Sequence, residues 1–213
     1  MLDSFISRKA CNSYILFNVA KEGLIVDPGF NDENRLIDHI KKLGVNIVAV
    51  LITHAHYDHI TALEDVMKEF PEATCYISED EIELLDNPKL NLSGFREDGC
   101  TRILMYVPRK IKLLSDSEII KVAGFEIKFI KTPFHTKGSA CYYVDSEKIL
   151  FSGDTLFYTT IGRTDLPTGS NRTVETSLKK LLTLPLDTKV LPGHGVATKL
   201  ERERNYNSYL RNI

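Results

Sequence analysis

Half of the six histidines in the chain share one heptapeptide with an aspartate, Thr53-His54-Ala55-His56-Tyr57-Asp58-His59. Residues 46–52, directly before it, end in an unbroken apolar run that is rich in valine and isoleucine. Such a run is typical of a strand that is covered on both faces, as in parallel sheets flanked by helices. The chain therefore has to fold so that these polar side chains gather at the carboxyl end of a buried strand.

Three further loops each follow a predicted strand and carry one residue of the same chemical kind, namely His135, Asp154 and His194. Any one of them alone is more often a helix cap or a surface group than a ligand. Together with the heptapeptide they offer imidazole and carboxylate groups, which zinc, iron and manganese accept. Seven candidate ligands exceed what one four-coordinate ion can use, so two ions that share a bridging group are expected.

Strands and helices alternate in both halves of the chain, which predicts an α/β fold of two sheets with helices on the outside. No convincing period is found over residues 86–109, and two short charge clusters, 109–112 and 201–204, are interpreted as solvated surface. The capping-box pattern Ser78-Glu79-Asp80-Glu81 predicts the start of a helix. Strands are predicted over residues 13–19, 24–26, 46–52, 74–77, 140–144, 149–152 and 189–191, a hairpin over 118–131, and helices around 36–43 and over 60–70, 174–184 and 199–210.

Charge and apolar patterning exclude several classes of function. The formal net charge is −2, from 29 acidic and 27 basic residues, so no excess of positive charge favours nucleic acid or anionic lipid as a partner. No stretch of eighteen apolar residues and no export signal is found, which predicts a cytoplasmic protein without a membrane segment. The cysteines at 11, 75, 100 and 141 form no C-x-x-C pair and are expected to be buried free thiols, and His39 is expected to be a surface or core-edge residue of its helix.

The sequence resembles the metallo-β-lactamase fold superfamily, whose H-x-H-x-D-H signature corresponds here to residues 54–59. The stretches TPFHTKGSACYYV, FSGDTLFYTTIGRTDLPTGS and LPGHGVAT are similar to those of small glyoxalase II-like hydrolases, and the similarity runs from about Asp27 to the C-terminus. This resemblance implies an αββα sandwich of two mixed sheets with helices on the outer faces. It also implies one catalytic domain over residues 1–213, without the helical C-terminal domain that binds glutathione in full-length glyoxalase II enzymes.

The resemblance also implies a ligand set. It places His54, His56 and His135 on one metal ion, and Asp58, His59 and His194 on a second. Asp154 would bridge the two ions, and Asp58 would belong to the catalytic centre together with a hydroxide held by both metals. Asp27, in a VDPG turn, would orient the ligand loop, although a plain turn role explains it equally well. The ions are expected to be divalent, with zinc favoured over iron or manganese.

The expected reaction is hydrolysis of a small 2-hydroxyacyl thioester. A thiolate leaves readily because its conjugate acid has a pKa of about 8.5, so a general acid is hardly needed. A persulfide dioxygenase with a single iron is the main alternative, followed by a lactonase or ribonuclease of the same fold. A metal-binding module without catalysis is disfavoured because structural zinc sites usually close with four ligands. The oligomeric state is left open.

Three residues are candidates for substrate contact. Arg163 could hold a carboxylate of the substrate, or it could form an ion pair with Asp165. Tyr142 and Tyr143 follow His135 on a predicted strand, so alternation would direct one of them to the site. Phe134, where related sequences commonly have glycine, is expected to pack in the core.

Overall fold

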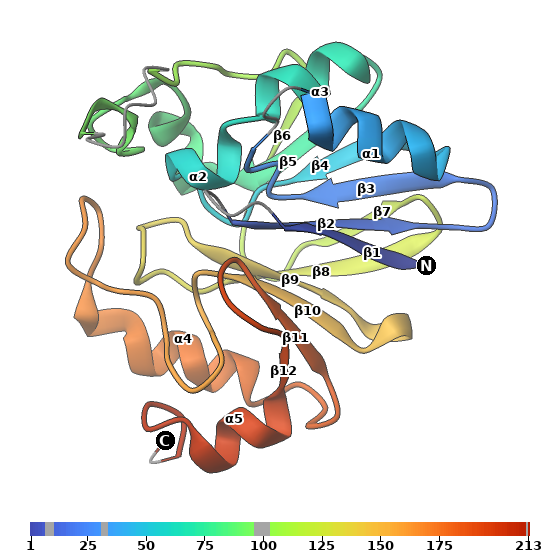
Figure 1. The fold of residues 1–213 in the computed structure, drawn as a ribbon. Helices are drawn as coiled ribbons and strands as arrows, with labels where there is room; N and C mark the ends of the chain where they lie inside the picture. The colour runs from blue at the N-terminus through green and yellow to red at the C-terminus, as the bar shows by residue number, and fades with distance from the viewer. Residues whose placement is uncertain (7–10, 31–33, 96–102, 212) are drawn as a thin grey trace.

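The computed structural model describes residues 1–6, 11–30, 34–95, 103–211 and 213, so the expectation for Cys100 lies outside the described residues. Two six-stranded sheets lie face to face, with helices on both outer sides (Figure 1). This is the αββα sandwich of two mixed sheets that the sequence predicts. Within the described residues, no helix is both long enough and apolar enough to cross a membrane.

The first sheet places its strands in chain order. Its first three strands are antiparallel, and the third to sixth are parallel. The connections between the parallel strands contain the helices that cover the outer face, as the βαβ rule requires. These elements are β1 (Leu2–Ile6), β2 (Asn12–Phe17), β3 (Glu22–Val26), α1 (Arg35–Leu43), β4 (Asn46–Leu51), α2 (Tyr57–Ile60), α3 (Leu63–Glu69), β5 (Thr74–Ser78), the 3-10 helices η2 (Glu79–Asp86) and η3 (Ser93–Phe95), and β6 (Ile111–Leu114).

The second sheet has the order β12-β11-β10-β9-β8-β7 and is antiparallel except between β10 and β11. The long connection between those two strands carries α4, which packs on the outer face of this sheet together with α5 (Figure 1). The elements are β7 (Ile119–Val122), β8 (Phe125–Lys131), β9 (Ala140–Val144), η4 (Asp145–Glu147), β10 (Ile149–Gly153), η5 (Asn171–Thr173), α4 (Val174–Leu181), β11 (Lys189–Pro192), β12 (Thr198–Lys199) and α5 (Leu200–Tyr206).

Three apolar layers hold the four structural layers together. Strand alternation decides which layer each side chain enters: in β4, Val50 faces α1 and α3, whereas Leu51 faces the second sheet. In β9, Tyr142 lies between the sheets and Tyr143 lies on the side of α4 and α5. Because β4 is covered on both faces, its sequence is almost wholly apolar, as expected of a central parallel strand.

The structure corrects several local expectations. The helix predicted over residues 60–70 is shorter, since α3 begins at Leu63 and the separate α2 ends at Ile60. The strands β1, β6 and β12 were not predicted. The pattern at Ser78 opens a 3-10 helix in which the Ser78 hydroxyl accepts a hydrogen bond from Asp80 N at 3.4 Å, whereas Glu81 is buried and turned elsewhere. Glu203, assigned to solvated surface, is 0% exposed, and the bonds that its carboxylate accepts from Thr159 N and Thr198 Oγ1 offset the cost of burying it.

Candidate metal centre

All seven candidate ligands follow the carboxyl ends of strands. The heptapeptide follows β4 in the first sheet, and it leads into α2, whose first turn contains Asp58 and His59. His135, Asp154 and His194 follow β8, β10 and β11 in the second sheet. Since the two sheets lie face to face, these loops meet at one end of the sandwich.

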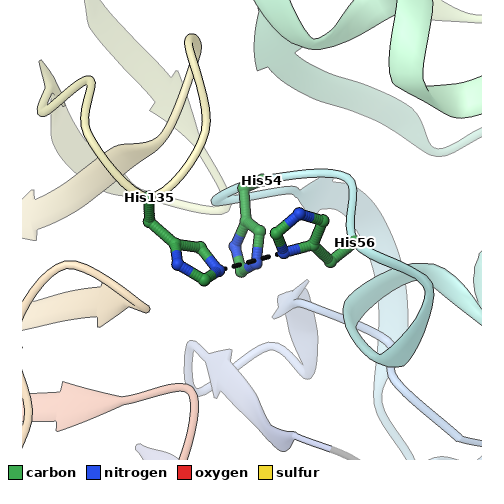
Figure 2. A group of neighbouring side chains, drawn as sticks. All are labelled: His54, His56 and His135. Atoms are coloured by element: carbon green, nitrogen blue, oxygen red, sulfur yellow. Dashed lines mark hydrogen bonds between the residues drawn. The ribbon is translucent and has the colours of Figure 1, made fainter. Parts of the chain in front are cut away.

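One group of imidazoles, called here the first donor group, consists of His54, His56 and His135. Figure 2 shows the three rings turned toward one another, with His135 reaching from the β8 loop to the two histidines of the β4 loop. His56 Nδ1 lies 3.0 Å from His135 Nε2, and the ring centroids of His54 lie 4.8 Å from those of each partner. All three side chains are buried.

The second donor group consists of Asp58, His59 and His194, again with ligand atoms within 4.8 Å of one another. His194 Nε2 lies 3.0 Å from Asp58 Oδ2 and 3.4 Å from His59 Nε2. This group is more open than the first, because the side chain of His194 is 40% exposed.

Asp154 lies between the two groups. Its Oδ2 is 3.4 Å from His135 Nε2 and 3.7 Å from His194 Nε2, and its Oδ1 is 3.4 Å from His59 Nε2. The carboxylate thus faces one imidazole of the first donor group and two of the second. Burial works against its charge, but the neighbouring histidines, above all His59, hold the pKa of Asp154 below its usual range.

Metal ions fit this arrangement because it contains buried ligand atoms without partners. Among the described residues, His54 Nε2, His56 Nε2 and Asp154 Oδ1 are buried and have no hydrogen-bond partner. A buried polar atom without a partner costs about 1–3 kcal/mol, so such atoms are rare in folded proteins. Imidazole nitrogens and a carboxylate oxygen are ligands for zinc, iron and manganese, and the donor chemistry therefore indicates a metal site.

The two donor groups differ in their protonation equilibria. Burial, reinforced by neighbouring imidazoles, lowers the pKa of His54 and brings that of His56 to about 3, so both rings are neutral and keep a lone pair for a metal. The pKa of Asp58 is lowered, because the attraction of His59 and a hydrogen bond from His194 outweigh burial. Burial likewise opposes a rise at His194, but the bond to Asp58 and the charge of Asp154 raise its pKa. The carboxylates of Asp58 and Asp154 therefore favour a positive charge within the second donor group.

Two contacts from outside the donor groups orient the rings. Asp27, the acid expected to orient the ligand loop, has Oδ2 at 2.9 Å from His59 Nδ1 and accepts from the Thr53 hydroxyl at 2.7 Å. The backbone oxygen of Arg163 lies 2.8 Å from His135 Nδ1. In each ring the contact is made by Nδ1, so Nε2 of His59 and Nε2 of His135 are turned toward Asp154.

A cavity of about 410 Å³ opens over both donor groups. Its wall contains His56, Asp58, His135, Asp154 and His194. The other lining side chains are mainly apolar, and they come from Tyr57, Leu92, Phe157 and Leu166, together with Gly162 and Arg163. The cavity therefore has one polar wall, formed by the donor residues, and mainly apolar walls around the rest of any bound carbonyl compound.

Two glycines allow the backbone to approach the ligands, and their importance was not foreseen. A Cβ atom at Gly162 would lie 2.0 Å from the Asp154 backbone oxygen, and one at Gly193 would lie 2.5 Å from Asp154 Oδ1 and from His59 Cε1. The only signal in the sequence is that each glycine stands directly beside a candidate, Arg163 or His194.

The guanidinium of Arg163 is engaged within the protein. It pairs with Asp165 through two bonds, 2.7 Å from Nε to Oδ1 and 2.8 Å from Nη2 to Oδ2, and both side chains are more than half exposed. Of the two roles considered for Arg163, the structure displays the ion pair, at the edge of the cavity. His39 forms a comparable pair with Asp3 at 2.7 Å and lies outside both donor groups, as expected for a core-edge residue.

The expectation that Tyr142 or Tyr143 points at the site is corrected. Both belong to the middle of β9, so alternation directs them into the two apolar layers beside that sheet, not toward the loops at its end. The Tyr142 hydroxyl lies 3.0 Å from the Ile52 oxygen, and the Tyr143 hydroxyl donates to Asp145. The cavity lining, as far as the chain is described, includes neither residue. Phe134 is 1% exposed and packs in the layer against α4, as expected.

Tyr142→Phe is expected to weaken the fold without changing substrate affinity. The substitution removes a buried hydroxyl that bonds to backbone oxygens, which should lower the free energy of unfolding by about 1 kcal/mol. For a chain of this size the melting temperature should fall by about 2–4 °C. Thermal unfolding and steady-state kinetics of the variant measure both effects. A several-fold rise in KM at unchanged melting temperature would contradict the assignment of Tyr142 to the core.

The sequence of this chain is similar to those of proteins named as hydrolases. Residues 6–194 match the model of the metallo-beta-lactamase superfamily. A probable metallo-hydrolase of Streptococcus pyogenes is 36% identical over 93% of this chain and 84% of its own length. The hydroxyacylglutathione hydrolase GloC of Haemophilus influenzae is 31% identical over 93% of this chain and 92% of its own.

Two solved structures extend the similarity to the fold. The crystal structure of BLEG-1 B3 metallo-beta-lactamase superposes with a TM-score of 0.90 at 35% identity and covers 99% of both chains. The structure of TTHA1623 in a di-iron-bound form superposes with a TM-score of 0.81 at 28% identity, covering 96% of this chain and 98% of that one.

Proposed function

Because this chain belongs to the metallo-beta-lactamase superfamily, we propose that it is a binuclear metallohydrolase that cleaves a small 2-hydroxyacyl thioester. The observation that carries the proposal is the pair of donor groups on either side of Asp154, both reaching the wall of one cavity. Four residues from the β4 loop and three from the second sheet supply seven donors, which suits two ions better than one.

Two bound ions would lower the pKa of a water molecule enough to make it a nucleophile at neutral pH and would polarise a carbonyl oxygen. The residues of the chain then have distinct tasks. The buried histidines of the first donor group would hold one ion, and the more open second group, with His194 40% exposed, would hold the other. Asp58 lines the cavity as a carboxylate, where it can accept a hydrogen bond during the reaction.

A thioester suits these surroundings. Its leaving thiolate has a conjugate acid of pKa about 8.5, so it departs without a proton from the protein. The histidines and carboxylates that line the described part of the cavity all belong to the donor groups or to Asp154. Similarity to a protein named as a hydroxyacylglutathione hydrolase supports the choice of acyl group and thiol.

Hydrolysis of a β-lactam is the second candidate. It is favoured by the similarity to BLEG-1 B3 metallo-beta-lactamase, which extends over 99% of both chains. The same site could act on either substrate, since both reactions begin with attack of a water-derived nucleophile on a carbonyl carbon.

The test is steady-state kinetics on purified protein whose metal content has been measured. The substrates are lactoyl-glutathione, an acyl-coenzyme A, a short thioester without a peptide, and a chromogenic β-lactam, with glutathione persulfide and oxygen uptake as a further arm. Preferred hydrolysis of lactoyl-glutathione supports the proposal. Preference for the β-lactam selects the second candidate, and oxygen uptake with a single iron selects a persulfide dioxygenase. Protein that carries both ions and hydrolyses no thioester overturns the proposal.

Arg163→Ala is expected to change KM for lactoyl-glutathione by no more than about twofold, because Asp165 already neutralises the guanidinium and exposed ion pairs contribute little. Asp165→Asn frees the guanidinium and should lower KM for this anionic substrate. Metal content and kcat should be unchanged in both variants. A tenfold rise in KM for Arg163→Ala would show that the guanidinium leaves Asp165 to hold the carboxylate of the substrate.

A further inference from the structure

The carboxylate of Glu81 is buried between the loops of the two sheets. Glu81 lies in η2 and is 0% exposed. Three donors converge on it: Ala55 N donates to Oε2 at 2.7 Å, and Thr136 Oγ1 and Gly138 N donate to Oε1 at 2.5 and 2.9 Å. Neither the donor groups nor the cavity lining includes Glu81.

The three donors belong to the two loops that supply the first donor group. Ala55 separates His54 from His56, and Thr136 directly follows His135. The β4 loop belongs to the first sheet and the β8 loop to the second, so one carboxylate binds backbone or side-chain donors from both sides of the sandwich. A change in its position would shift the His54–His56 segment relative to His135.

The surroundings of Glu81 are built closely around the carboxylate. A Cβ atom at position 138 would lie 2.7 Å from Glu81 Cγ and 2.8 Å from its Oε1, so only glycine allows this approach without a shift. All three partners are donors, which an ionised carboxylate satisfies and a glutamine cannot. Glutamine would present one oxygen and one NH₂ group, and the NH₂ group would face a donor.

We propose that Glu81 is the positioning residue of the first donor group, holding the His54–His56 segment and His135 at the separation that one metal ion requires. The proposal rests on the metal site of the proposed function, but not on the identity of its substrate. Groups that orient metal ligands from outside typically contribute about 10–100-fold to metal affinity.

The experiment measures zinc affinity without any substrate. Metal-free protein is titrated with zinc in competition with a chromophoric chelator, in a His194→Ala background that removes a donor from the second group alone. Burial raises the pKa of Glu81 to about 7, so the titrations are made at pH 8, where the carboxylate is ionised. Glu81→Gln is compared with Glu83→Gln, a matched control in the same helix whose carboxylate pairs with Lys137 at 2.6 Å on the surface.

Glu81→Gln is expected to weaken zinc binding about 10–100-fold, and Glu83→Gln less than about twofold. A purely structural Glu81 would lower the unfolding midpoint of the metal-free protein and leave zinc affinity equal to that of the control, which would overturn the proposal. If the Glu81→Gln protein does not fold, Thr136→Val provides the same readout with the carboxylate intact. It should weaken zinc binding several-fold, and an unchanged affinity there also overturns the proposal. Absence of thioester hydrolysis would leave these results unaffected.

Discussion

Asp154→Ala is expected to lower kcat/KM by about a thousandfold, which corresponds to about 4 kcal/mol of transition-state stabilisation, and to weaken binding of the second metal ion. Asp154 is the one carboxylate in the described site whose oxygens lie within 3.7 Å of imidazoles from both donor groups. Its removal takes away the carboxylate that the two donor groups would share as a bridging ligand. Metal content by elemental analysis and activity on the best thioester measure the two effects.

His39→Ala is the control for this result. His39 is a half-exposed histidine of α1 whose partner is Asp3, so its loss should change neither metal content nor activity. Equal losses in the two variants would show that the ligands have been assigned wrongly.

Removing the metal should abolish hydrolysis and destabilise the protein. Dialysis against a strong chelator leaves His54 Nε2, His56 Nε2 and Asp154 Oδ1 buried without a hydrogen-bond partner. An ion present at a thousand times its Kd stabilises the folded state by about 4 kcal/mol, which in a chain of this size corresponds to a fall of about 10 °C in Tm on removal.

Adding back divalent metal should restore activity, with saturation near two equivalents, because seven donors exceed the need of one ion. Elemental analysis, calorimetric unfolding and activity during titration measure this. A stable content of one iron, with no gain on adding zinc or manganese, would move the assignment to a dioxygenase. Full activity in protein shown to contain no metal would contradict the assignment altogether.

The donor residues could be located from sequence because each occurs in a local pattern. Apolar runs indicate buried strands, and the residues that directly follow their ends must lie at one edge of the sheets. The same reasoning predicted the two-sheet fold, since strand and helix periods alternate over short distances.

The supporting contacts could not be predicted in this way. Glu81 meets Ala55 and Gly138, which are 26 and 57 positions away, and the pattern around Glu81 resembles an ordinary helix start. Tyr142 and Tyr143 were misjudged because alternation assigns side chains to the two faces of a strand, whereas the site lies in the loops beyond the strand ends. The edge strands β1 and β6 were missed because each is stabilised by pairing with a neighbouring strand, and a local sequence pattern does not show which strand that is.

The first donor group draws His54 and His56 from one sheet and His135 from the other. An ion held there would cross-link positions that are 81 residues apart, His54 and His135, and would join the loops of the two sheets in the folded protein, where a disulfide would do so in the unfolded chain as well. Unlike a disulfide, this cross-link is reversible and depends on the metal supply. In the metal-bound protein, one sheet could therefore not unfold while the other stays folded. Partial unfolding would be confined to segments distant from the bound ions.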